Sequence, residues 1–143
     1  MRIAIAAVVL GWLAVLSVYD VIQRRLPNAL TLPGGGVIVV GAVVAGHGPT
    51  ALAGAAVLTT VYLLVHLVSP TAMGAGDVKL AIGLGALTGC FGADVWFLAA
   101  LGAPLLTGAI GVLARLGWSA TTVPHGPSMC AASVAAVGLS VLS

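Results

Sequence analysis

Hydrophobic runs of helix length dominate the sequence and constrain its fold more than any other feature. They cover approximately residues 3–20, 30–46, 50–68, 76–92, 95–115 and 128–143. A transmembrane helix needs roughly 20 apolar residues, and its backbone polar groups must be satisfied within the segment. We therefore expect an all-α integral membrane protein with about six transmembrane helices, forming one membrane-embedded domain over residues 1–143.

The charge content supports this expectation. Only 6% of the 143 residues are charged and 61% are hydrophobic, whereas soluble proteins carry about 25% charged residues. So few charges cannot cover a water-soluble fold, and membrane lipid is the expected surrounding. The net charge of +2 comes without a basic run, which argues against nucleic acid as a partner. Cys90 and Cys130 are widely separated and are interpreted as buried thiols.

Lys and Arg residues indicate the orientation of the helices. Arg24 and Arg25 lie in the first connection, Lys79 lies beside the third and Arg115 lies at the fifth, while the second and fourth have neither. Cytoplasmic loops are enriched in these residues. We therefore expect both termini on the non-cytoplasmic side, although Arg2 argues the other way. The first run ends in Asp20 rather than a cleavage site, so it is interpreted as a spanning helix and not as a secretory signal.

The chain has only three carboxylates, and two of them lie at matching helix ends. Asp94 follows Gly92 in an outer turn and is expected to cap the fifth helix. Asp20 and Asp77 each lie at a cytoplasmic helix end, so the topology places them at similar depth. An ionisable residue in a membrane segment is a functional candidate by default. When two carboxylates share a site, one can hold a proton while the other stays ionised, and together they can activate water for attack on an amide.

The motifs around these aspartates resemble those of prepilin peptidases. Gly74-Ala75-Gly76-Asp77-Val78-Lys79 is similar to the family's Gly-x-Gly-Asp-x-Lys signature, and Asp20-(x)3-Arg24-(x)2-Pro27-Asn28 resembles its other aspartate motif. The resemblance implies an intramembrane aspartic endopeptidase of the cell membrane, active near the cytoplasmic face without cofactor or metal. Its partners would be type IV pilin-like precursors, each losing a short basic leader after a glycine.

The same resemblance assigns roles to residues. Asp20 and Asp77 would be catalytic, and the residues expected to bind substrate or shape the site are Gly74, Gly76, Lys79, Arg24 and Pro27. Longer members of the family carry an N-terminal region with paired cysteines and N-methyltransferase activity. Here the first aspartate comes too early for such a region, so we expect the short, peptidase-only form, similar to those of Flp/Tad-type or archaeal flagellin-like systems.

Several residues have more than one interpretation. Gly74 and Gly76 leave room for an extended substrate, or are ordinary loop glycines. Lys79 is two residues beyond Asp77 and faces elsewhere, so contact with lipid headgroups is expected. Arg24 would pair with Asp20 if the helix continued. Spacings of four residues also link Ala81, Gly85 and Gly89, which would allow another helix to approach closely.

Three features of the sequence have no assigned role in the site. His66 is interpreted as a packing or interfacial residue, and Arg25 as a topology signal. In Pro124-His125-Gly126-Pro127, the family often has an aromatic residue where this chain has His125, so the contribution of the last helix to the site stays open.

Two other classes of function compete with the peptidase. A small proton- or cation-coupled transporter would use the same two aspartates, and a structural membrane subunit would pair them with Arg24 and Lys79. Inverted repeats would favour the transporter, but the two halves of the sequence show no convincing internal symmetry. We therefore favour the peptidase.

Overall fold

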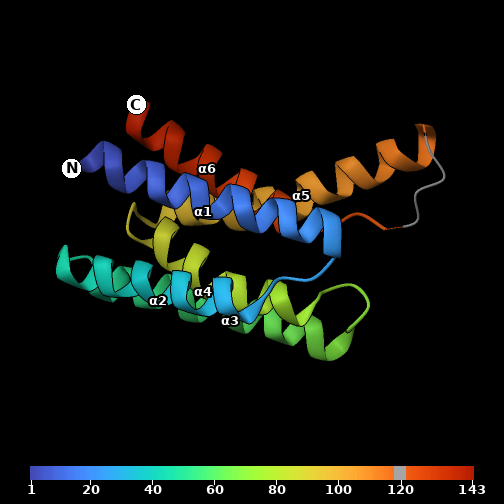
Figure 1. The fold of residues 1–143 in the computed structure, drawn as a ribbon, viewed down its shortest axis with the longest axis horizontal. Coiled ribbons are helices and arrows are strands. Elements are labelled where there is room, and N and C mark those ends of the chain that lie inside the picture. Colours follow the sequence, from blue (N-terminus) through green and yellow to red (C-terminus); the bar gives the residue numbers. More distant parts are fainter. Residues whose placement is uncertain (118–121) are drawn as a thin grey trace.

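The computed structural model describes residues 1–117 and 122–143, and this part of the chain forms six helices (Figure 1). They are α1 (Arg2–Gln23), α2 (Asn28–Val44), α3 (Gly48–Val68), α4 (Ala75–Gly89), α5 (Ala93–Gly117) and α6 (Gly126–Leu142). Each lies on one of the expected apolar runs, and their ends differ from the expected ones by a few residues. The prediction of an all-α protein is therefore confirmed.

The helices differ in their capacity to cross a membrane. By length and composition, α1, α3 and α5 are each long and apolar enough to do so, whereas α2 and α6 are shorter apolar helices. The 15 residues of α4 extend only about 22 Å, less than the roughly 30 Å of a hydrocarbon layer. Three long apolar helices make a membrane protein plausible, and the full set of six spans stays a prediction.

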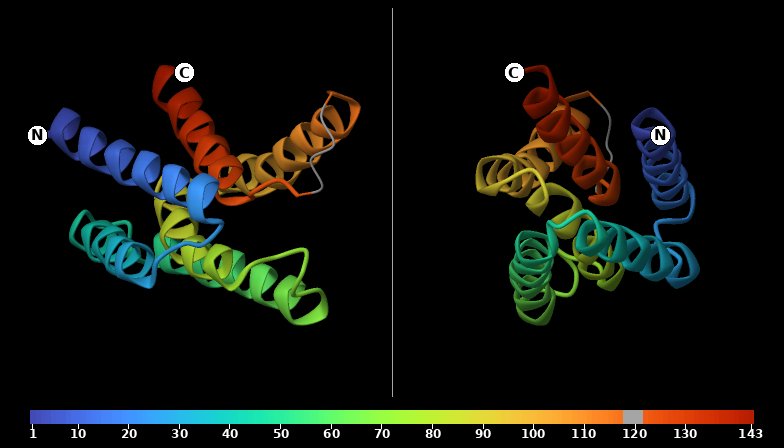
Figure 2. Two further views of the ribbon diagram at one scale, coloured as in Figure 1. Left: turned by 45° about the vertical axis from the view of Figure 1, so that its right-hand side comes forward. Right: turned by 90° about the vertical axis from the view of Figure 1, so that its left-hand side faces the viewer.

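In Figure 1, α1, α5 and α6 lie on one side of the molecule and α2 and α3 on the other, with α4 packed mainly on α2 and α3. We call α1, α5 and α6 the first sub-bundle, and α2, α3 and α4 the second. The most extensive helix contacts lie within these groups, since α4 packs mainly on α3 and α2, and α6 packs mainly on α5 and α1. Figure 2 shows α4 in the middle of the molecule, where it also touches α5 and α6. Asp20 and Asp77 therefore belong to different sub-bundles.

Glycines allow the short central helix α4 to lie directly against α3. A Cβ atom on Gly85 would lie 2.5 Å from the carbonyl oxygen of Gly54, and one on Gly89 would lie 2.6 Å from that of Thr50. Only glycine permits backbones to pack this closely. The close approach expected from the small-residue spacing in this run is confirmed.

One end of the molecule carries both aspartate motifs. Both termini and the α2–α3 and α4–α5 connections lie at the opposite end (Figure 1). We call the end formed by the α1–α2 and α3–α4 connections the aspartate end. Asp20 lies in the last turn of α1 and Asp77 in the first turn of α4. The two therefore share one end, as the alternating topology predicted.

Asp94 lies at the other end, and its predicted role as a helix cap is wrong. Helix α5 begins at Ala93, so Asp94 lies inside the first turn. Gly92 turns the chain just before the helix with φ +112°, a conformation that favours glycine. The carboxylate of Asp94 still lies near the positive end of the helix dipole.

Candidate active site

Asp20 is buried in the last turn of α1 and is held by the start of α6. Its Oδ2 atom accepts a hydrogen bond from the backbone N–H of Gly126 at 3.0 Å. Because Gly126 is the first residue of α6, the carboxylate lies at the positive end of a helix dipole. A Cβ atom on Gly126 would lie 2.5 Å from Oδ2. Glycine at this position is therefore a requirement of the contact.

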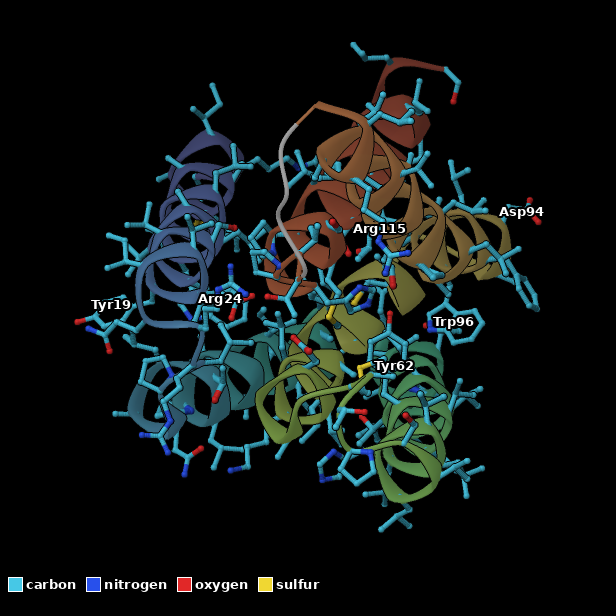
Figure 3. All side chains as sticks on the ribbon, turned by 90° about the vertical axis from the view of Figure 1, so that its right-hand side faces the viewer. Tyr19, Arg24, Tyr62, Asp94, Trp96 and Arg115 are labelled. Atoms are coloured by element: carbon cyan, nitrogen blue, oxygen red, sulfur yellow. The ribbon has the colours of Figure 1, made fainter. Side chains whose placement is uncertain are left out.

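Helix α1 stops before Arg24 can stack over Asp20. Arg24 has left-handed backbone angles (φ 50°, ψ 32°), and its N–H donates to the carbonyl oxygen of Asp20 at 2.9 Å. Its guanidinium donates to the hydroxyl of Thr122, although it is near enough for its charge to act on Asp20. Figure 3 shows Arg24 at the aspartate end. The side chain therefore ties the end of α1 to the segment before α6.

Asp77 is buried in the first turn of α4, and the two glycines before it have different surroundings. A Cβ atom on Gly76 would lie 2.9 Å from Cβ of Leu26, in the α1–α2 connection. A Cβ atom on Gly74 would lie 3.5 Å from Oδ2 of Asp77, which is ordinary contact. Gly74 also has extended backbone angles (φ −73°, ψ 150°), which any residue can adopt. Only Gly76 is therefore required by packing, a distinction absent from the sequence motif.

Lys79 connects the two motifs. Its Nζ atom donates to Oδ1 of Asn28 at 2.7 Å, a contact within the protein that the sequence did not indicate, and its expected contact with lipid headgroups stays a prediction. Asn28 begins α2 directly after Pro27, whose extended backbone (φ −69°, ψ 132°) forms the N-cap position. Together with the Gly76–Leu26 contact, this hydrogen bond fixes the start of α4 against the α1–α2 connection.

The two aspartates are electrostatic neighbours. The charge of Asp20 acts on Asp77, and both charges act on the buried thiol of Cys130 in α6. Among the described residues, however, α1 and α4 form no extensive contact with each other. The pair is therefore assembled by the elements around it, at the boundary between the sub-bundles.

A partly buried series of hydrogen-bonding side chains beside the aspartates was not assigned from the sequence. Tyr62 of α3 lies close enough to Asp77 to experience its charge, and its hydroxyl lies 3.2 Å from Nε2 of His125. Nδ1 of His125 lies 2.7 Å from the hydroxyl oxygen of Thr107 in α5. The Pro-His-Gly-Pro segment was a sequence signal for these hydrogen bonds through His125. Tyr62 lies in the middle of an apolar run and gave no such signal. Figure 3 shows Tyr62 pointing into the interior.

Two histidines near the site differ in their roles. His66, at the end of α3, donates from Nδ1 to the carbonyl oxygen of Met73 at 2.6 Å, and so holds the turn before Gly74. Burial lowers the pKa of His125 below its ordinary value of 6.5, so its ring is neutral at pH 7. Arg25 is exposed.

Comparison with known protein families places the chain in a recognised group. The model of the type IV leader peptidase family matches residues 7–113. This range includes both aspartate motifs and ends before His125 and Gly126. No curated protein and no solved structure matches the chain significantly.

Proposed function

The chain belongs to the type IV leader peptidase family, and on that premise we propose that it removes the leader of pilin-like precursors with two catalytic aspartates, Asp20 and Asp77. The observation that carries this proposal is the convergence of two buried carboxylates from separate sub-bundles at one end of the molecule. Residues 1–143 would act as one peptidase domain.

The two carboxylates divide the roles of base and acid. Asp20 accepts the hydrogen bond from Gly126 and lies near the positive charge of Arg24, and both favour an ionised carboxylate. Asp20 is therefore assigned as the base and Asp77 as the group that holds the proton. Asp20 removes a proton from a water molecule as the oxygen of that water bonds to the scissile carbonyl carbon. Asp77 donates its proton to the developing oxyanion. As the C–N bond breaks, Asp20 passes the proton that it took from water to the leaving nitrogen, and the hydroxyl formed on the old carbonyl returns its proton to Asp77.

The surface around the site favours a substrate that arrives along the membrane. Large apolar side chains are exposed on helices of both sub-bundles, for example Val18, Leu67 and Leu113. Such a surface suits a precursor whose apolar helix lies in the bilayer and whose basic leader lies at the anionic cytoplasmic surface. The scissile bond would lie at their junction, next to the exposed Gly74.

Cleavage in lipid vesicles tests the proposal. Purified protein is incubated with a pilin-like precursor, and the products are identified by intact mass. We expect a shortened product cut after the glycine at the end of the leader. A bulky residue in place of that glycine, or a soluble spacer between leader and apolar helix, should reduce cleavage sharply.

Two results would contradict this function. Equal cleavage of a soluble peptide without an apolar segment would exclude delivery along the membrane. A failure to shorten any pilin-like precursor, combined with a proton or cation flux that depends on Asp20 and Asp77, would identify a transporter.

A further inference from the structure

The relative placement of the two aspartates depends on contacts between the sub-bundles. Three side-chain hydrogen bonds cross this boundary among the described residues. Trp12 Nε1 donates to the carbonyl oxygen of Leu30 at 2.9 Å, and Trp96 Nε1 donates to that of Gly54 at 3.0 Å. The third joins Tyr62 and His125, and it alone involves a side chain that experiences the charge of Asp77.

The direction of each hydrogen bond around His125 follows from its neighbours. The hydroxyl of Thr107 donates its single proton to the carbonyl oxygen of Ala103 at 3.0 Å, so its oxygen can only accept from His125. Nδ1 of His125 therefore carries the ring hydrogen. In a neutral imidazole the other nitrogen is then an acceptor, so the hydroxyl of Tyr62 donates to Nε2. The polar side-chain atoms of Tyr62, His125 and Thr107 thus each have a defined role as donor or acceptor.

His125 also adjoins the group that holds the other aspartate. It is the N-cap residue of α6, and its carbonyl oxygen accepts from the N–H of Met129 at 3.0 Å. The next residue, Gly126, donates its N–H to Asp20. A shift of His125 would therefore move the donor to Asp20 and release the hydroxyl of Tyr62 beside Asp77.

We propose that His125 is a positioning residue, a latch between the sub-bundles that fixes Asp20 relative to Asp77. Its ring holds Tyr62 of the second sub-bundle, and its backbone sets the start of α6 in the first. The proposal rests on the proposed function for its effect on cleavage. It concerns a residue outside the range of 7–113 that the family model matches.

Substitutions that remove only the latch test its effect on the reaction. His125→Phe keeps an aromatic ring without hydrogen bonds, Tyr62→Phe removes one hydroxyl, and His125→Gln keeps an acceptor for Tyr62. The matched control is Trp96→Phe, which removes a hydrogen bond between the sub-bundles at the opposite end.

Alignment of catalytic groups acts mainly in the transition state, so we expect both Phe variants at the latch to lower kcat about tenfold or more and to change KM less than about threefold. Both substitutions break the same hydrogen bond, the one between Tyr62 and His125. The kcat of the double variant should therefore be no lower than that of the slower single variant. His125→Gln should recover most of kcat, and Trp96→Phe should stay within about twofold of wild type. The proposal would be overturned if His125→Phe had the kcat of wild type. It would also be overturned if the losses of kcat in His125→Phe and Tyr62→Phe added up in the double variant, or if Trp96→Phe lost as much kcat as they do.

A distance measurement tests the latch independently of cleavage. Spin labels are attached to Val68→Cys on α3 and Leu116→Cys on α5, both strongly exposed, in a Cys90→Ala background in which Cys130 stays buried. Pulsed electron paramagnetic resonance should give one narrow distance distribution for wild type and Trp96→Phe, and a shifted or broadened one for His125→Phe and Tyr62→Phe. An unchanged distance distribution in His125→Phe and Tyr62→Phe would overturn the proposal. This result can be read even if the protein does not cleave pilin-like precursors.

Discussion

Adding one methyl group at Gly126 should separate the start of α6 from Asp20. In Gly126→Ala the new Cβ atom would lie 2.5 Å from Oδ2 of Asp20, whereas non-bonded heavy atoms prefer roughly 3.5 Å or more. The carboxylate must therefore retreat by about 1 Å, which stretches its hydrogen bond of 3.0 Å. A misplacement of this size at a reacting group can cost about 100-fold in rate, equivalent to about 2.7 kcal/mol in the barrier.

The assay compares kcat for leader removal in vesicles between wild type, Gly126→Ala and Gly138→Ala. Gly138 lies in the same helix, and a Cβ atom there would meet nothing within 4 Å. The control therefore makes the same chemical change in α6 without touching the site, and we expect its kcat to equal that of wild type. Gly126→Ala should lose about two orders of magnitude in kcat while it still inserts and keeps its helical content.

A kcat within about twofold of wild type for Gly126→Ala would refute this reasoning, because it would mean that the α6 contact does not place the catalytic carboxylate. Equal losses in Gly126→Ala and Gly138→Ala would refute it in another way, since the effect would then come from the helix as a whole.

Three further outcomes are expected. Gly76→Ala should lower the temperature of thermal unfolding in detergent because its Cβ atom would lie 2.9 Å from Cβ of Leu26, whereas Gly74→Ala, with 3.5 Å to the nearest atom, should unfold at the same temperature as wild type. Lys79→Met and Asn28→Ala should each slow cleavage, and the double variant should be no slower than the slower single one, because they break one hydrogen bond. Burial lowers the pKa of His125 below 6.5, so as the pH falls below 6.5 the unfolded state takes up the proton first. The stability of wild type relative to His125→Phe should therefore be greatest above pH 6.5 and decline below it, as measured by thermal unfolding in detergent across that range.

The parts of the structure that depend on local sequence were predictable. Apolar runs bounded by Pro, Gly and charged residues located all six helices of the described chain. The alternation of Lys and Arg among the connections predicted that Asp20 and Asp77 lie at the same end, which the fold shows.

The parts that depend on tertiary packing were not predictable. No local pattern marks Tyr62, because its role comes from a segment 63 residues away that supplies His125. Lys79 was expected at lipid headgroups, and only the packing of α4 on α2 brings Asn28 within its reach. The division into two sub-bundles likewise follows from how helices pack, and hydropathy carries no information about it.

Leader removal by aspartate variants tests the central claim most directly. Asp20→Asn, Asp77→Asn and Asp94→Asn are compared in the same vesicles with the same precursor, at equal amounts of inserted protein. Because water activation needs both a base and an acid, Asp20→Asn and Asp77→Asn should give no measurable product, and Asp94→Asn should cleave as wild type does. Near-normal cleavage by Asp77→Asn, or an essential Asp94 together with a dispensable Asp20, would contradict the account.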